Sequence, residues 1–438
     1  MLMRENPNDK DIPFFPFHLD KSDNDFAFYV KNHLMERPVN LNSTSAEILR
    51  LCDGENTLLD ITKFLANRYP DSGGIDYVKP KIVTLLKVLS EKELIWWREI
   101  PVRLIPVLAP QTIFWEITSL CNLHCLHCVV DAGLKDKREL LANRLLELVE
   151  EFASFGVENI AFSGGEPLMH PDFFIIAKKV YDFGMHIQVA TNGTLVTRKV
   201  ARELRDLGAQ VQVSLDGSNS LIHNAMRPGV QAFARSVAGI KALVNEEHKV
   251  TIGCVLSSLN SDDIPNLLAL GEKLGVSAFR LIPFVPKGRG KSHFDIEVSP
   301  KTVKKVTLFL REKRKKTKLS ISPIEFEELL DCDICDPPML DQPLKCGGAV
   351  SYATITPAGE VLPCHFFEGV RAESVRSRSF SDIWSHSRFL NYFRSLRIAD
   401  LHGKCRTCSY LSVCAGSCRA VNFSKGDLFG GNRGCWIT

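Results

Sequence analysis

The sequence predicts an α/β protein built around a parallel sheet. Between about residues 110 and 285 one unit recurs, consisting of an amphipathic helix, a glycine, a short apolar strand and a polar turn. Strands that alternate with helices are joined by right-handed crossovers, so they run parallel to one another. Their polar turns then meet at one edge of the sheet, where parallel sheets bind ligands.

Six strands and five helices are expected in this region. The strands are expected at residues 114–117, 160–162, 187–189, 211–213, 250–256 and 279–282. Glycine is the usual left-handed stop after a helix, and four of the helices are followed by one, at Gly156, Gly184, Gly208 and Gly275. The sheet is either open or curled into part of a barrel.

Composition describes an ordinary globular chain. Its 438 residues are 45% hydrophobic, enough for two or three domains. We find no secretion signal and no run of eighteen apolar residues, so we expect a cytoplasmic protein without a membrane partner. A net charge of +3 is too small to imply a nucleic acid partner. Fourteen cysteines without a signal peptide favour thiolate-bound metal over disulfides.

A cysteine loop follows the first expected strand. Cys121, Cys125 and Cys128 are spaced C-x3-C-x2-C. A structural zinc site needs four protein ligands, and this loop supplies three thiolates. A cubane iron-sulfur cluster with one iron left for another ligand fits that number.

With Gly164, Gly165, Glu166 and Pro167 at the end of the second strand, the loop resembles the radical S-adenosylmethionine (SAM) superfamily. In that family the loop binds a 4Fe-4S cluster whose open iron is chelated by SAM, and a Gly-Gly-Glu-Pro turn holds the methionyl amine. Glycines allow close approach to a ligand, and a carboxylate suits an ammonium. The resemblance implies a partial (β/α)6 barrel over residues 108–290 and a low-potential electron donor such as a flavodoxin or ferredoxin.

The fourth strand of that family often ends in Ser-Leu-Asp-Gly and is followed by His-Asp-x-x-Arg. Ser214, Asp216 and Arg227 match these motifs and are candidates for contacting SAM or the substrate. Asn224 replaces the usual aspartate, at a position where the family would suggest an acid-base or ribose role. An alternative makes Arg227 and His223 supports behind the site.

Two histidines lie inside the cysteine loop. The family often places an aromatic residue just before the third cysteine, so His127 is expected to stack near the adenine. His124 is expected in solvent. No general base is assigned, because any Asp or Glu near the barrel mouth could serve.

The C-terminal region, residues 341–438, resembles the SPASM extension, which binds two auxiliary 4Fe-4S clusters. Its seven cysteines have the family spacing: Cys346, Cys364, Cys405, Cys408, Cys414, Cys418 and Cys435. The ligand pairing of the family implies an outer cluster on Cys405, Cys408, Cys414 and Cys435, and an inner cluster on Cys346, Cys364 and Cys418. Structural zinc is the alternative, since C-x2-C is common in zinc ribbons.

The inner cluster is then one ligand short. Cys335, which we include among the metal ligands, or Cys332 would complete it from the connecting segment 291–340, or the position stays open for substrate. Sequence spacing alone cannot fix this connectivity. Cys52 and Cys254 are expected to be buried, inert thiols.

Residues 1–100 predict a separate winged-helix-like α+β domain. Strands are expected at 26–30 and 35–41, helices from a Thr44-x-x-Glu47 capping box, from Thr57 and over 78–90, and a wing at 94–97. Winged helices often bind DNA. Here 13 Lys and Arg stand against 16 Asp and Glu, a net charge of −3, which is the wrong sign for a phosphate-binding face.

This segment resembles instead the RiPP recognition element, related to the peptide chaperone of pyrroloquinoline quinone (PQQ) biosynthesis. In that domain a leader peptide adds a strand to the small sheet and packs against a helix. Main-chain hydrogen bonds then provide affinity, and side-chain pockets provide register. A purely structural cap on the barrel is the alternative.

The order of modules resembles the radical SAM/SPASM peptide maturases. The resemblance implies an enzyme that reductively cleaves SAM to a 5'-deoxyadenosyl radical, abstracts hydrogen, and crosslinks or otherwise modifies a ribosomal precursor peptide. Two alternatives stay open. One is a SPASM enzyme acting on a small molecule, such as a porphyrin side chain in heme biosynthesis. The other is a non-catalytic, metal-stabilised peptide-binding protein.

Overall fold

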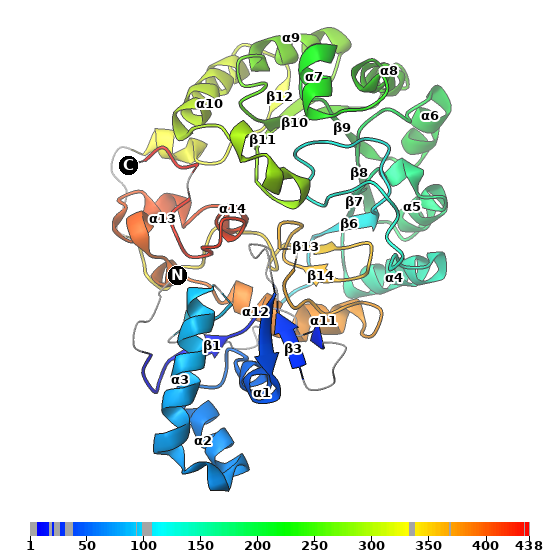
Figure 1. Ribbon diagram of the computed structural model, residues 1–438. Coiled ribbons are helices and arrows are strands. Elements are labelled where there is room, and N and C mark those ends of the chain that lie inside the picture. Colours follow the sequence, from blue (N-terminus) through cyan, green and yellow to red (C-terminus); the bar gives the residue numbers. More distant parts are fainter. Residues whose placement is uncertain are drawn as a thin grey trace.

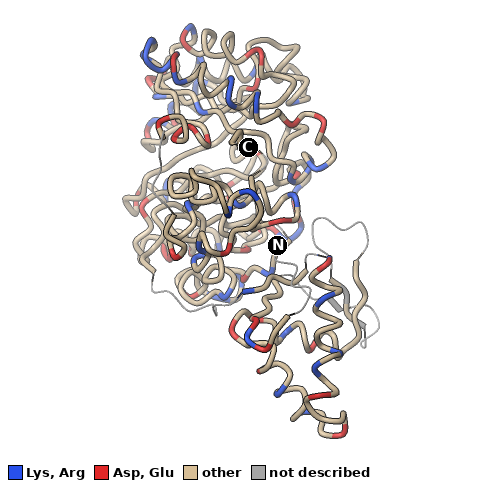
Figure 2. Tube along the Cα trace, turned by 90° about the vertical axis from the view of Figure 1, so that its left-hand side faces the viewer, with Lys and Arg blue, Asp and Glu red and all other residues tan. Residues whose placement is uncertain are grey.

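The computed structural model shows a large α/β body with a smaller N-terminal domain below it (Figure 1). It describes residues 7–16, 20–21, 27–30, 38–92, 94–98, 107–332, 338–367, 369–432 and 434–437. Basic and acidic side chains are interspersed along the chain, as the small net charge leads one to expect (Figure 2).

The body is organised by one large sheet, which has nine strands within the described residues. In sheet order these are β12 (Ser320–Ile321), β11 (Ala278–Pro283), β10 (Thr251–Leu256), β9 (Gln210–Ser214), β8 (His186–Thr191), β7 (Asn159–Gly164), β6 (Thr112–Thr118), β13 (Tyr352–Ile355) and β14 (Val361–Leu362). Neighbours from β12 to β13 are parallel, and β14 is antiparallel to β13. The predicted parallel α/β architecture is confirmed.

Helices cover the outer face of this sheet (Figure 1). They are α4 (Ala142–Phe155), α5 (Phe173–Asp182), α6 (Arg198–Asp206), α7 (Ser220–Met226), α8 (Ala232–Asn245), α9 (Ile264–Leu274) and α10 (Pro300–Arg314). Gly156 and Gly275 stop α4 and α9 with φ of 97° and 76°, a conformation that costs glycine little. The short α7 was not predicted.

Strand alternation separates two environments within the sheet. On β9, Val211 and Val213 are buried in the core beneath the helices, whereas Gln210, Gln212 and Ser214 lie on the inner side. Successive side chains of a strand point to opposite faces, so a single strand serves both the core and the inside of the curved sheet.

The N-terminal domain combines a small sheet with three helices. The sheet contains β2 (Asp20–Lys21), β3 (Ala27–Val30) and β4 (Val39–Asn42), and the helices are α1 (Ser43–Leu51), α2 (Leu58–Arg68) and α3 (Ile75–Glu91). Ile61, Leu65, Ile82 and Leu86 belong to its own hydrophobic core. Residues 26 and 35–37 of the two expected strands lie outside the described residues.

Two details of this domain differ from prediction. The N-cap of α1 is Asn42, whose side chain accepts a hydrogen bond from Ser45 N at 2.8 Å, so the capping box expected at Thr44 is wrong. Asn caps a helix as well as Ser or Thr does, and here it precedes the expected residue. The expected wing, β5 (Trp96–Arg98), pairs with β1 (Ile12–Phe14) instead of the small sheet.

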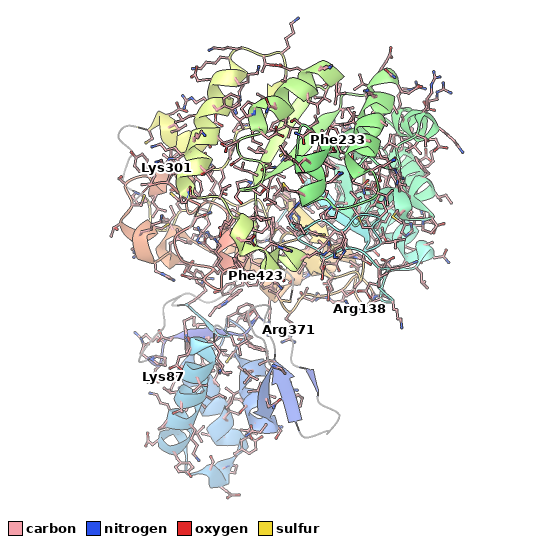
Figure 3. All side chains as sticks on the ribbon, turned by 45° about the horizontal axis from the view of Figure 1, so that its top comes forward. Lys87, Arg138, Phe233, Lys301, Arg371 and Phe423 are labelled. Carbon is pink, nitrogen blue, oxygen red and sulfur yellow. The ribbon has the colours of Figure 1, made fainter. Side chains whose placement is uncertain are left out.

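The β1–β5 pair joins the domain to the C-terminal region. Phe14 stacks on Tyr392 of α12 (Arg388–Arg394) with ring centroids 4.2 Å apart, and Trp96 contacts the edge of Phe423 at 6.1 Å. Phe14 and Trp96 belong to the core of the large body, not to that of their own domain. Phe423, in α14 (Arg419–Phe423), and Arg371 lie on the body side of this boundary (Figure 3).

The rest of the C-terminal region is mostly short helices and loops. They include α11 (Phe380–His386) and α13 (Leu411–Cys414). In the part of the chain that the structure describes, no helix is both long and apolar enough to span a membrane.

Candidate active site

A cavity of about 250 Å³ lies at the carboxyl ends of the parallel strands. Of the residues predicted from sequence, it is lined by Cys121, Cys125, His127, Cys128, Gly164, Gly165, Ser214 and Arg227. Apolar side chains complete much of the wall, among them Val129, Val130, Ile282 and Phe366. The fold thus brings the cysteine loop, the glycine turn and the end of β9 together.

The two glycines dock the turn after β7 onto the beginning of the cysteine loop. A Cβ on Gly165 would lie 2.2 Å from Leu120 O, and Gly164 has a φ of 108°. Gly165 N donates to Thr118 O at 2.7 Å, and Glu166 N donates to Leu120 O at 2.8 Å. The glycines therefore permit close approach to protein backbone, which makes turn and loop one unit.

Glu166 is fully buried and, like Pro167, does not line the cavity. Its carboxylate accepts hydrogen bonds from Thr191 Oγ1 and from Asn192 N, both at 2.7 Å. Burial raises the pKa of Glu166 to about 7, although these hydrogen bonds oppose the rise. Glu166 thus shapes the cavity through Thr191 and Asn192, which do line it.

A buried ion pair stands behind the cysteine loop. Arg227 Nε donates to Asp216 Oδ2 at 2.6 Å, and Asp216 Oδ1 accepts from Val255 N at 2.8 Å. Burial alone would raise the pKa of Asp216, but Arg227 and nearby histidines hold it below its usual value. Arg227 Nη1 also lies 3.7 Å from Cys125 Sγ, so the pair reaches a thiol of the cysteine loop.

The histidines of this region have distinct surroundings. His127 is buried with Nε2 3.3 Å from Asp216 Oδ2, and burial lowers its pKa to about 4, so the ring is neutral at pH 7. His223 lies behind the site, where its Nδ1 accepts from Asp216 N at 3.2 Å. His124 is exposed, as expected. Asn224 Oδ1 accepts from Phe233 N at 3.1 Å, a contact at the beginning of α8.

Sequence reasoning missed Arg289, which follows β11. Its guanidinium donates to Cys125 O at 2.9 Å and pairs with Asp131 at 3.0 Å. Arg289 therefore holds the cysteine loop through a backbone oxygen, whereas Arg227 contacts a thiol. The cavity also contains Glu116 and His365, for which the only sequence signals were a strand end and the neighbouring Cys364.

The C-terminal cysteines gather in two places. Cys405, Cys408, Cys414 and Cys435 line a cavity of about 250 Å³. Burial raises the pKa of the Cys364 thiol, and the nearby Cys418 and Cys346 raise it further, so these three side chains lie near one another. These are the groups that the resemblance assigns to the outer and inner clusters. Cys332 is disulfide-bonded and Cys335 lies outside the described residues, so the fourth inner ligand stays a prediction.

The donor set fits iron-sulfur clusters. Thiolates are the ligands of such clusters, and three or four of them surround each place described above. Within the described residues, no three His, Cys, Asp or Glu side chains converge as they would around one metal ion. The three sets of cysteines are therefore assigned from the part of the fold in which they lie. Cys52 lies in the core of the N-terminal domain and Cys254 in the core of the large body, and burial raises the pKa of both thiols.

Comparison with known proteins identifies the class of protein. Residues 115–271 match the radical SAM superfamily, residues 346–409 the SPASM iron-sulfur cluster-binding domain, and residues 34–95 coenzyme PQQ synthesis protein D. The chain belongs to the radical SAM superfamily and is a radical SAM/SPASM enzyme. Its cofactors are 4Fe-4S clusters and SAM, so the zinc and non-catalytic alternatives are wrong.

Relatives within this family differ in their named activities. The chain is 33% identical to the AdoMet-dependent heme synthase of Methanosarcina barkeri, over 71% of this chain and 92% of that protein. It is 28% identical to the mycofactocin maturase of Mycolicibacterium smegmatis, over 73% and 80%. Streptococcus suis SuiB bound to its precursor peptide SuiA has the same fold, with a TM-score of 0.64, 14% identity, and coverage of 99% and 100%.

Proposed function

We propose that this enzyme modifies a ribosomally made peptide whose leader segment binds to the N-terminal domain. The observation that carries the proposal is the match of residues 34–95 to PQQ synthesis protein D, within the same chain as a radical SAM barrel. The likeness to SuiB, which was crystallised with a precursor peptide, extends over this domain as well, because it covers 99% of the chain.

The small sheet offers an edge for such a peptide. In the described part of the chain, β4 has one strand neighbour, β3, and its other side is unpaired. An extended peptide can add to an edge of this kind through main-chain hydrogen bonds. Helix α3 presents Tyr77 and Val88, which are 56% and 44% exposed, as apolar contacts for leader side chains.

The cavity is suited to radical chemistry. When bound, the first cluster and SAM supply a 5'-deoxyadenosyl radical, and the auxiliary clusters offer a one-electron acceptor. Arg227 and Arg289 both contact the cysteine loop, and the apolar wall excludes water and stray hydrogen donors. We also propose a flavodoxin or ferredoxin as electron donor and a cytoplasmic location, because thiolate-bound metal is typical of a reducing compartment.

The test uses the reconstituted full chain with SAM, dithionite and synthetic peptides from short reading frames beside the gene. A mass change in one peptide is the expected result. Tyr77→Ala and Val88→Asp should raise the KM for that peptide about ten-fold, the loss of roughly 1.4 kcal/mol of binding. Phe64→Ala on α2, with a similarly exposed side chain, is the matched control.

Deletion of residues 1–100 is a poorer test, although the domain is a separate unit in the sequence. It would remove Phe14 and Trp96 from the core of the large body and expose Tyr392. Loss of activity after such a deletion would therefore report damage to the fold as well as loss of peptide binding.

A small-molecule substrate is the second candidate. The 33% identity to an AdoMet-dependent heme synthase favours a tetrapyrrole. That alignment covers 71% of this chain. Turnover of a porphyrin carboxylate at a rate that Tyr77→Ala does not change, with no peptide modified, would favour this candidate over ours.

A further inference from the structure

A second cavity of about 250 Å³ lies on the inner side of the curved sheet, next to the active-site cavity. Ser163 and Ala190 line both. On β9, Ser214 lines the active-site cavity, which we call the upper cavity. Gln212, two residues earlier on the same face, lines the second cavity, which we call the lower cavity. The lower cavity therefore continues the active site toward the amino ends of the strands.

About half of the residues that line this second cavity are polar. Interiors of parallel α/β barrels are usually filled by branched apolar side chains. Here the lining includes Gln188, Gln210, Gln212 and Arg280. Gly253 leaves room for one of them, because a Cβ at that position would lie 2.7 Å from Gln212 Nε2.

The hydrogen-bonding groups of these polar side chains have no partner among the described residues. Among the described residues, the three glutamine amides and the Arg280 guanidinium make neither a hydrogen bond nor an ion pair. Arg280 lies two residues before Ile282, which lines the upper cavity, so its backbone is about 7 Å further down the strand. A cation thus faces the inside of the barrel within reach of a substrate held in the active site.

We propose that Arg280 and the three glutamines form a subsite for a carboxylate of the substrate. A guanidinium fork binds a carboxylate through two parallel hydrogen bonds, and amide NH2 groups can donate to the same oxygens. In a peptide substrate the carboxylate belongs to an Asp or Glu side chain in the modified segment. That assignment rests on the proposed function, whereas the carboxylate subsite does not.

The test uses 4-azidobenzoate as a photoreactive probe on the reconstituted full chain with SAM, and 4-azidobenzamide as its neutral analogue. Labelled residues are mapped by mass spectrometry. The acid should label peptides that contain β8, β9 or β11, and the amide should not. Arg280→Gln should lower this labelling about ten-fold or more, as expected for loss of a charge-assisted pair, and Arg280→Lys should lower it less.

Lys305→Gln is the matched control, since it removes one positive charge from the outer surface, where Lys305 is 76% exposed. Its labelling should equal that of the unaltered protein. Iron content and thermal midpoint establish that each variant has folded. Equal labelling by acid and amide, full labelling of Arg280→Gln, or no label on these strands would overturn the subsite.

Competition then identifies the source of the carboxylate. Protection by hexapeptides that contain glutamate, but not by their glutamine counterparts, supports an acidic peptide. Protection from labelling by hemin, but not by its dimethyl ester, supports the carboxylate subsite and indicates that its substrate is a small molecule. Labelling needs no leader peptide, so a protein that is labelled yet modifies no peptide contradicts the proposed function alone.

Discussion

At the scale of single residues, Cys125 is held by three groups that sequence spacing did not connect. Arg227 Nη1 lies 3.7 Å from its thiol, Arg289 donates to its carbonyl oxygen at 2.9 Å, and Asp216 orients Arg227. Burial raises the pKa of the Cys125 thiol, and the charge of Arg227 opposes that rise, so Arg227 favours the deprotonated form that binds iron. The cysteine motif is therefore only one part of the cluster site.

Cys125→Ser should abolish the first cluster and the cleavage of SAM, because a hydroxyl is a poor iron ligand. The iron content should fall by about four atoms per chain, the content of one cubane. Iron analysis and 5'-deoxyadenosine production are the measurements. Cys52→Ser is the control, since the Cys52 thiol donates to Ile48 O and a serine can do the same. SAM cleavage by Cys125→Ser would refute the assignment of this loop.

The ion pair between Asp216 and Arg227 should make removal of one partner more destabilising than removal of both. Asp216→Asn or Arg227→Met alone leaves a buried charge without its partner, which typically costs about 3–5 kcal/mol. The double variant should recover part of this loss. Thermal unfolding of both single variants and of the double variant measures it. Additive losses would show that the two residues act independently.

At the scale of elements, the turn after β7 requires glycine for steric reasons. Gly165→Ala should displace the cysteine loop, because the new Cβ would meet Leu120 O at 2.2 Å. We expect loss of iron from the first site, measured by electron paramagnetic resonance of the reduced protein. Gly133→Ala is the matched control, with its nearest atom 4.0 Å away, and should retain the signal. Equal spectra would contradict this role of Gly165.

Helix α1 tests the corrected cap. Asn42→Ala should destabilise the first turn by about 1 kcal/mol, because Ser45 N loses its acceptor. Thr44→Ala should change stability by less than about 0.5 kcal/mol, since Thr44 lies inside the helix and is exposed. Hydrogen exchange of the peptide spanning 43–51 measures both. Faster exchange in Thr44→Ala alone would restore the sequence-based cap.

At the scale of the whole molecule, an aromatic junction connects the N-terminal domain to the C-terminal region. Phe14 and Trp96 come from opposite ends of the N-terminal domain and meet Tyr392 and Phe423 of the C-terminal region. Arg98 adds a hydrogen bond to Ser395 O at 3.1 Å. The N-terminal domain therefore packs on the body through the β1–β5 pair.

Trp96→Ala should loosen this junction at a cost of about 3–5 kcal/mol, the usual range for a buried aromatic. The N-terminal domain should then be released earlier in limited proteolysis, and the thermal midpoint should fall. Phe64→Ala, at a side chain that is 48% exposed, is the control. An unchanged cleavage pattern for Trp96→Ala would show that other contacts hold the domain.

Much of the fold could be predicted because its signals are local. The six strands expected from apolar runs correspond to β6 to β11, and the glycines expected to stop α4 and α9 do so. Strands β12 and β14 have two residues each, too few for a periodic pattern, and β13 has four. They were missed for that reason, although β13 extends the sheet beside β6.

By itself, the sequence determined the alternating architecture and the presence of thiolate-bound clusters, because periodicity and cysteine spacing are written along the chain. Only the tertiary structure decided which groups meet. It placed Arg289 against Cys125 and gave the Glu166 carboxylate a hydrogen bond from Asn192 N. It also placed Arg280 in the wall of the second cavity, on the inner side of the sheet. Such contacts depend on strand register and on how crossovers return to the sheet, and neither is encoded in the spacing of the residues concerned.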